Sequence, residues 1–250
     1  MKVRSFLFSA VMLAAVSFTL SSCNDLVQKF ATKAINESVV FEKEDTAKWG
    51  SVVERNLDLP AFSAIETKGA VQVVFTQDSV FSVRVRGNEK CIDEYLFTVK
   101  NDELKAVVKG FSGTVNGKTP AVTLLIAAPD LNEIEFSGAG RLEMPDSVSL
   151  PGSLKVEMAG AGEVCIGDLT LRSLEIEVSG AARCDLAKVT TTDDVEIEVN
   201  GAGEVKANVF CNELSVELDG AVGAVLSGNC KTFTCEQNGP GVVDTSKLNK

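Results

Sequence analysis

The sequence predicts an all-β protein folded as a β-solenoid, a coil of stacked rungs that are each about 20 residues long. Two observations lead to this prediction. A short phrase, apolar-Glu-apolar-x-Gly, recurs between Leu131 and Asp244, and apolar residues alternate with polar ones within each copy. The glycines of successive copies are 22, 20, 21, 19 and 19 residues apart, which is typical of a repeat array. They are Gly138, Gly160, Gly180, Gly201, Gly220 and Gly239.

The alternation predicts strands with one buried face. In the copy around Gly180, Leu174, Ile176 and Val178 point to one side, and the matching positions of neighbouring copies are also apolar. A single strand pair cannot bury such a face, but identical rungs stacked in register bury it continuously. The glycine suits a corner that needs a positive φ, and the small residue after it lets successive corners stack closely.

Residues 1–22 are predicted to be an export signal, with Lys2 and Arg4 before the apolar stretch from Phe6 to Leu20. The segment 20–23, Leu-Ser-Ser-Cys, resembles a bacterial lipobox, which implies that Cys23 becomes a lipid-bearing first residue. Acyl chains such as palmitate on Cys23 would hold the protein to a membrane. We therefore expect a lipid-anchored protein of the cell envelope, at the outer membrane, with the periplasmic and surface faces both open. The alternative is an ordinary secretory signal followed by an incidental cysteine.

The rest of the chain divides by composition and regularity. Residues 23–51 are of mixed charge and are predicted to be the lipidated cysteine and a tether. Residues 52–129 are rich in strand patterns but less regular, and the segment 64–70 echoes the repeat phrase. We expect this region to form atypical N-terminal rungs that cap the stack, with a separate domain as the alternative. The regular rungs cover 130–245 and are followed by a tail, 246–250.

The composition indicates an exported acidic protein. The chain has no His, seven Cys and a net charge of −11, which becomes −13 once the two cations of the signal are removed. Nucleic acid is excluded as a partner, because phosphate binding needs clustered Lys and Arg. Cys211 and Cys230 occupy equivalent positions in consecutive rungs, so a disulfide and two free thiols are both open. The oligomeric state is open as well.

A column of like charge is the most informative surface feature. The residue three before each turn glycine is Glu in all six copies, and in the predicted stack these carboxylates lie about 5 Å apart, where like charges repel. One interpretation is a solvated face that keeps the protein soluble. The other is a row of oxygen ligands for a cation such as Ca²⁺, or a docking strip for a basic partner. The residues are Glu135, Glu157, Glu177, Glu198, Glu217 and Glu236.

A second column alternates in sign. Three residues after the glycine, successive copies carry Arg141, Glu163, Arg183 and Glu204. This arrangement predicts a structural ion ladder, in which each exposed pair contributes about 0.2–1 kcal/mol. A catalytic set of Arg and carboxylate residues is the alternative.

The sequence predicts no catalytic residues. Without His, the Ser-His-Asp, Cys-His and His-metal sites are excluded, and no phosphate-binding loop is present. Cleavage of a polysaccharide by two carboxylates, as in a lyase or hydrolase on the same scaffold, remains an alternative. However, Trp49 and Tyr95 are the only Trp and Tyr, and the repeats are nearly uniform. Uniformity favours an extended binding surface, or a structural spacer in the envelope.

The lipobox, the segment 62–73 (FSAIETKGAVQV) and the recurring Gly-Ala turns together resemble the "putative auto-transporter adhesin, head GIN domain" family. The resemblance covers about residues 52–245. It implies a single-stranded right-handed parallel β-helix, carried on exported proteins of Gram-negative bacteria, with a role in adhesion and no catalytic residues to transfer. We therefore expect an adhesin-like module whose partner is a glycan or a surface protein of the envelope or of a host.

Overall fold

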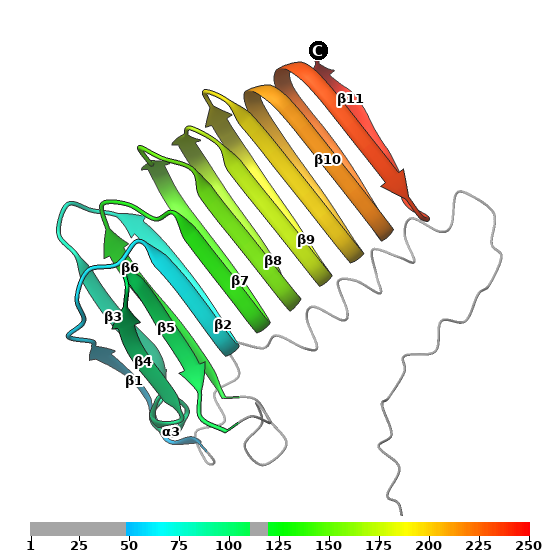
Figure 1. The fold of residues 1–250 in the computed structure, drawn as a ribbon. Coiled ribbons are helices and arrows are strands. Elements are labelled where there is room, and N and C mark those ends of the chain that lie inside the picture. Colours follow the sequence, from blue (N-terminus) through cyan, green and yellow to red (C-terminus); the bar gives the residue numbers. More distant parts are fainter. Residues whose placement is uncertain (1–48, 111–119) are drawn as a thin grey trace, which may run out of the picture.

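The computed structural model describes residues 49–110 and 120–250, and in them the chain is almost entirely β-strand (Figure 1). One helix, α3, is defined in these residues and spans Glu89–Asp93. No helix in this part of the chain is long and apolar enough to cross a membrane. The predicted all-β class is confirmed. The predicted signal, Cys23 and residues 24–48 of the predicted tether lie outside the described residues.

The strands belong to one large sheet that does not close on itself. Its order is β1-β3-β6-β2-β7-β8-β9-β10-β11, while β5 pairs with β2 and carries β4. The bounds are β1 Val52–Asn56, β2 Ala64–Gln77, β3 Ser82–Asn88, β4 Tyr95–Lys100, β5 Glu103–Val108, β6 Ala121–Ala128, β7 Glu133–Ser149, β8 Leu154–Leu171, β9 Leu174–Thr191, β10 Asp194–Asn238 and β11 Val243–Asn249.

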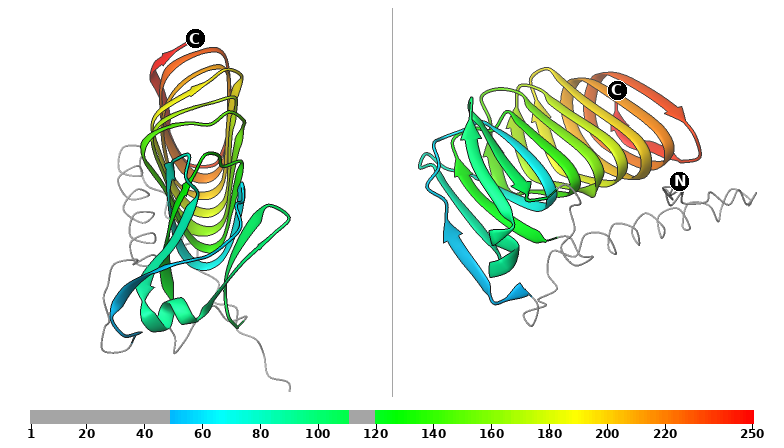
Figure 2. Two further views of the ribbon diagram at one scale, coloured as in Figure 1. Left: turned by 90° about the vertical axis from the view of Figure 1, so that its left-hand side faces the viewer. Right: turned by 60° about the horizontal axis from the view of Figure 1, so that its bottom comes forward.

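The strands β2, β7, β8, β9 and β10 run parallel, and each repeat phrase pairs with the same phrase in the next copy. Gly69 pairs with Gly138, Gly138 with Gly160, Gly160 with Gly180 and Gly180 with Gly201. In Figure 2 these strands follow one another along one direction from β2 to β11. The register therefore matches the period of the sequence, and β2 is the first member of the stack.

The core lies along the apolar face that the alternation predicts. Ile134, Val156, Ile176 and Ile197, one from each of four successive copies, are all 0% exposed. Burying an aliphatic side chain of this size contributes roughly 1.5–3 kcal/mol, so the repeated core stabilises every junction between copies. Trp49 is also buried against this core, although the sequence analysis places it in the tether.

The turn glycines are required by both conformation and space. Gly180 has φ +139°, and a Cβ at this position would lie 1.9 Å from the carbonyl oxygen of Gly160. That separation is far below any real contact, and the same approach recurs at Gly201, 2.0 Å from the carbonyl oxygen of Gly180. The backbone corners therefore touch directly, which only glycine permits.

The N-terminal end of the stack changes direction. β5 and β6 run parallel to the first and second halves of β2, but β4 then adds to β5, β3 to β6 and β1 to β3, all antiparallel. The alternation patterns do not predict this reversal. Because β2 also pairs with β7, the N-terminal region and the repeat array share one sheet.

The Tyr95 side chain supplies hydrogen bonds to the backbone beside the corner at Gly69. Its buried hydroxyl group accepts a hydrogen bond from the Ala70 N–H at 2.9 Å and lies 3.0 and 2.8 Å from the carbonyl oxygens of Ala70 and Pro120. β5 ends at Val108 and β6 begins at Ala121, so neither strand covers the corner at Gly69. The hydroxyl group takes the place of the missing backbone partners.

Candidate functional site

The register of the strands brings the glutamates that lie three residues before each turn glycine into one column along the stack. Glu66 pairs with Glu135, Glu135 with Glu157, Glu157 with Glu177 and Glu177 with Glu198. The corners of the last copies stack in the same way, since a Cβ at Gly220 would lie 2.2 Å from the Gly201 carbonyl oxygen and one at Gly239 would lie 2.4 Å from that of Gly220. The glutamates three residues before these glycines, Glu217 and Glu236, therefore continue the column. We call the set the acidic column: Glu66, Glu135, Glu157, Glu177, Glu198, Glu217 and Glu236.

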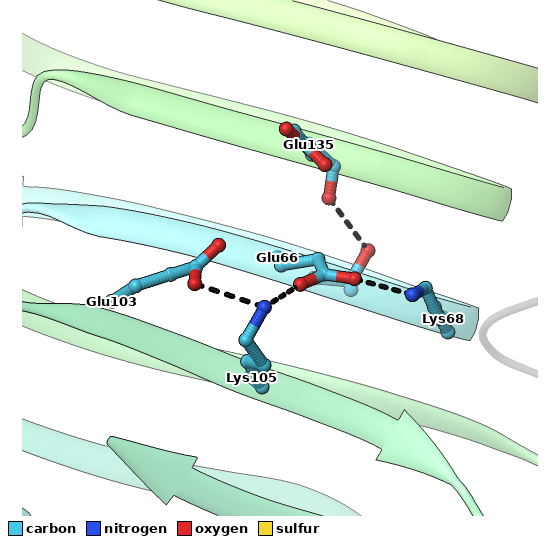
Figure 3. Close-up of polar contacts among 6 residues, drawn as sticks. Glu66, Lys68, Glu103, Lys105 and Glu135 are labelled. Atoms are coloured by element: carbon cyan, nitrogen blue, oxygen red, sulfur yellow. Dashed lines mark hydrogen bonds and ion pairs between the residues drawn. The ribbon is translucent and has the colours of Figure 1, made fainter. Parts of the chain in front are cut away.

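Glu66, at the N-terminal end of the acidic column, is buried and fully neutralised (Figure 3). Its carboxylate contacts the ammonium groups of Lys68, at 2.5 Å, and of Lys105, which also lies 2.9 Å from Glu103. The hydrogen bond from Lys105, followed by that from Lys68, lowers the pKa of Glu66. Glu66 is not among the glutamates predicted from the repeat, although its place three residues before Gly69, in the segment 64–70 that echoes the phrase, could have revealed it.

Glu135, the next residue along the column, lies beside Glu66 without reaching a cation. Among the described residues its carboxylate forms no ion pair, and its backbone oxygen accepts a hydrogen bond from the Thr67 hydroxyl on β2 at 3.2 Å. Partial burial, and then repulsion by Glu157 and Glu133, raises the pKa of Glu135. This position therefore keeps the like-charge repulsion that the sequence predicts.

Lys155 relieves the repulsion in the middle of the column. Its ammonium group lies 2.8 Å from Glu157, 2.8 Å from Glu175 and 3.0 Å from Glu177, so one cation on β8 holds carboxylates on β8 and β9. The hydrogen bond from Lys155 lowers the pKa of Glu175. This stretch of the column is therefore partly compensated, with one ammonium group for three carboxylates.

Beyond β9 the column is uncompensated. In the part of the chain that the structure describes, none of its carboxylates there forms an ion pair; Glu198 accepts a hydrogen bond from the Asn200 amide at 2.6 Å. Partial desolvation, followed by repulsion from Glu198 and Asp219, raises the pKa of Glu217. We call this set the C-terminal acidic patch: Glu196, Glu198, Glu217, Asp219 and Glu236.

The geometry bears on the cation hypothesis. Across residues 49–110 and 120–250, no group of three or more His, Cys, Asp or Glu side chains is placed to hold a metal ion. Ca²⁺ requires six to eight oxygen ligands around one point, whereas the column presents its carboxylates in a row. The arrangement therefore suits a partner with several separate positive charges better than a single ion.

Among the described residues, the predicted ion ladder links only one pair of neighbouring strands. Arg141 lies 3.3 Å from Glu163 on the next strand and 2.5 Å from Glu143 on its own. Arg183 instead lies 3.9 Å from Asp185, and Glu204 lies 3.0 Å from Lys206, each two residues along the same strand. This second column is thus compensated locally, mostly within strands, with three cations for four carboxylates.

The described cysteines are free thiols that serve as core or near-core residues. Cys184 is fully buried, and Cys211 and Cys230 are buried without forming a disulfide. Burial, and then the neighbouring Cys230, raises the pKa of Cys211 to about 11. A thiol with so high a pKa is a poor nucleophile at neutral pH.

Comparison with known proteins agrees with this architecture. A model of the family described as "Putative auto-transporter adhesin, head GIN domain" matches residues 61–187 and 169–250. A crystal structure described as a putative adhesin from Bacteroides fragilis NCTC 9343 is similar with a TM-score of 0.62 and 17% identity, covering 80% of this chain and 97% of that one. A putative adhesin from Parabacteroides distasonis ATCC 8503 gives 0.55 and 16%, covering 78% and 96%. At these identities the similarity establishes the fold alone.

A search of curated proteins found no match to the chain.

Proposed function

Because this chain belongs to the family of the auto-transporter adhesin head GIN domain, we propose that it is an adhesin-like binding module of the cell envelope, without catalytic activity. The module would present its acidic column to a basic surface on an envelope or host protein. The C-terminal acidic patch is the observation that carries this proposal. Carboxylates that repel one another and form no ion pair among the described residues gain most from a positively charged partner.

The scaffold suits such a role. We propose that the parallel stack is a single-stranded right-handed parallel β-helix with rungs of about 20 residues; the in-register pairing of successive copies and the period of the glycines support this. A rigid coil fixes the spacing of the carboxylates at the spacing of neighbouring strands, about 4.8 Å. Preorganised charges lose little conformational entropy on binding.

We further propose that acyl chains on Cys23 attach the module to the outer membrane. The support is the resemblance of residues 20–23 to a lipobox, after a signal-like segment. An anchored module holds its acidic face at the envelope, where it can meet a partner repeatedly. Mass spectrometry of the protein extracted from membranes tests this anchor, because an unlipidated N-terminus beyond residue 23 would exclude it.

Binding of residues 24–250 to a panel of glycans and of envelope and host-matrix proteins tests the function. The diagnostic variant is Glu198→Gln with Glu217→Gln and Glu236→Gln, which neutralises three residues of the C-terminal acidic patch. The matched control is Glu143→Gln with Glu163→Gln and Glu204→Gln, which removes the same charge from the locally compensated column.

We expect saturable binding that the patch variant loses and the control keeps. Equal loss in both variants would indicate attraction to net charge rather than to the patch, and would contradict the proposal. Absence of binding to every member of the panel would favour a structural spacer. Release of cleaved sugars from any glycan would instead identify an enzyme.

A further inference from the structure

The stack ends at its C-terminal side in strand edges that nothing in the described chain covers. β11 is the last strand of the sheet order and pairs only with β10, along Ala224–Asn229. Residues 231–238, the last part of β10, form the neighbouring edge of the same terminal copy. The other edge strands, β1 and β4, have 5 and 6 residues, short lengths that limit unwanted pairing.

The core at this end is incompletely buried. Leu214, Val216 and Ala224 are 0–2% exposed because the next copy covers them. Their equivalents in the terminal copy, Phe233, Cys235 and Val243, are only partly buried. The ammonium group of Lys250 lies 4.3 Å from the centroid of the Phe233 ring, so a single side chain lies where a further copy would otherwise pack.

The charge of the terminal copy differs from that of its neighbour. Residues 212–229 contain three carboxylates and no Lys or Arg, whereas residues 230–250 contain three lysines and two carboxylates. The lysines are Lys231, Lys247 and Lys250. They would repel a basic strand, but they complement the carboxylates Glu217, Asp219 and Glu236 at the end of the acidic column of another copy.

We propose that the C-terminal edge binds a second copy of this chain, edge to edge, in a two-fold symmetric dimer. A closed pair places the lysines of each terminal copy near the acidic column of the other and covers Phe233 and Val243 from both sides. The N-terminal end cannot receive this edge in a head-to-tail array. Antiparallel strands and the Tyr95 hydroxyl group already occupy the position where another parallel copy would add.

Backbone geometry indicates which groups pair. The Ala224 N–H donates to the Val242 carbonyl oxygen at 2.9 Å, so Val242 and Asp244 face β10. Because backbone groups alternate along a parallel strand, the N–H and carbonyl groups of Val243 face the open side. A partner strand at this edge would take up these groups, as in other cases of strand addition.

Sedimentation velocity of residues 24–250 over a wide range of concentrations tests the proposal. We expect a reversible dimer of the wild type. Lys231→Glu with Lys247→Glu should raise the dissociation constant at least about tenfold by placing carboxylates against carboxylates. Val243→Pro should do the same by removing an edge donor, and Lys100→Glu on β4 is the control that should leave the dimer unchanged. Melting of each variant by circular dichroism identifies any that fails to fold.

A monomer at every concentration would overturn the proposal, as would a dimer that none of the edge variants weakens. Open-ended oligomers would contradict the two-fold arrangement. If the protein stays monomeric and binds an added lysine-rich peptide through this edge, the occupant of the edge is a different protein and the proposal is wrong. Because the lysine variants leave the C-terminal acidic patch intact, loss of the dimer and loss of partner binding are distinguishable.

Discussion

The Tyr95 hydroxyl group takes the place of the backbone partners that β5 and β6 do not supply at the first glycine corner. Replacing Tyr95 with Phe deprives the buried Ala70 N–H of the acceptor that it has in the structure. The expected cost is about 1–3 kcal/mol of unfolding free energy. Denaturant unfolding measures it. An unchanged free energy of unfolding would show that another group satisfies the Ala70 backbone.

The turn glycines lead to a second prediction at this scale. Gly180→Ala adds a Cβ 1.9 Å from the Gly160 carbonyl oxygen at φ +139°, so we expect destabilisation of at least about 2 kcal/mol or a shift of the corner. Gly152→Ala is the matched control, because its nearest neighbour, the Asn132 side chain, is 3.7 Å away. Thermal melting that ranks the two variants equally would contradict the stacking of the corners.

Two glutamates of the acidic column should affect the pH dependence of stability in opposite directions. The pKa of Glu135 is raised, so the folded state binds a proton more readily than the unfolded state, and stability falls as the pH rises through that range. The pKa of Glu66 is lowered, so its contribution is present above pH 4.5 and is lost as the pH falls below it.

Glu135→Gln should therefore raise the unfolding free energy at pH 7 by some tenths of a kcal/mol, whereas Glu66→Gln should lower it by about 1–3 kcal/mol. Urea unfolding at pH 4 and pH 7 distinguishes them, since both differences should shrink at the lower pH. The same sign for both variants at pH 7 would contradict the assigned environments.

At the scale of the elements, Lys155 joins two strands through three carboxylates. Lys155→Gln should release the repulsion among Glu157, Glu175 and Glu177 and cost roughly 1–2 kcal/mol at low salt, given about 0.2–1 kcal/mol for each exposed pair. Lys188→Gln, which loses a single pair with Asp168, is the control and should cost less. If the difference does not diminish in about 0.5 M salt, its origin is not electrostatic.

The elements also show where sequence periodicity predicts structure and where it does not. The copies between β7 and β10 repeat every 19 to 22 residues, so the register and six of the seven residues of the acidic column, all but Glu66, follow from the spacing alone. Lys105 reaches Glu66 from a strand 39 residues away, through the pairing of β5 with β2. The repeat period does not connect β5 with β2. Between them in the sequence lie β3 and β4, which pair antiparallel with β6 and β5. The contact between Lys105 and Glu66 could therefore not be predicted from the spacing of the repeats.

At the scale of the whole molecule, charge is distributed unevenly along the stack. Neutralising lysines occupy the first copies and the middle, whereas the column from β10 onward has none among the described residues. A partner attracted by this gradient should bind more weakly as salt is added, because exposed charges are screened over about 10 Å at 0.1 M. Binding that is unaffected between 0.05 and about 0.5 M salt would point to an apolar contact instead.

The most direct test of the account is carbodiimide footprinting of the carboxylates, with and without the partner found in the binding panel. The account predicts that Glu198, Glu217 and Glu236 become protected in the complex, while Glu143 and Glu204 on the locally compensated column remain equally reactive. Protection of the locally compensated column, with the C-terminal acidic patch still open to the reagent, would contradict the claim that this patch is the binding surface.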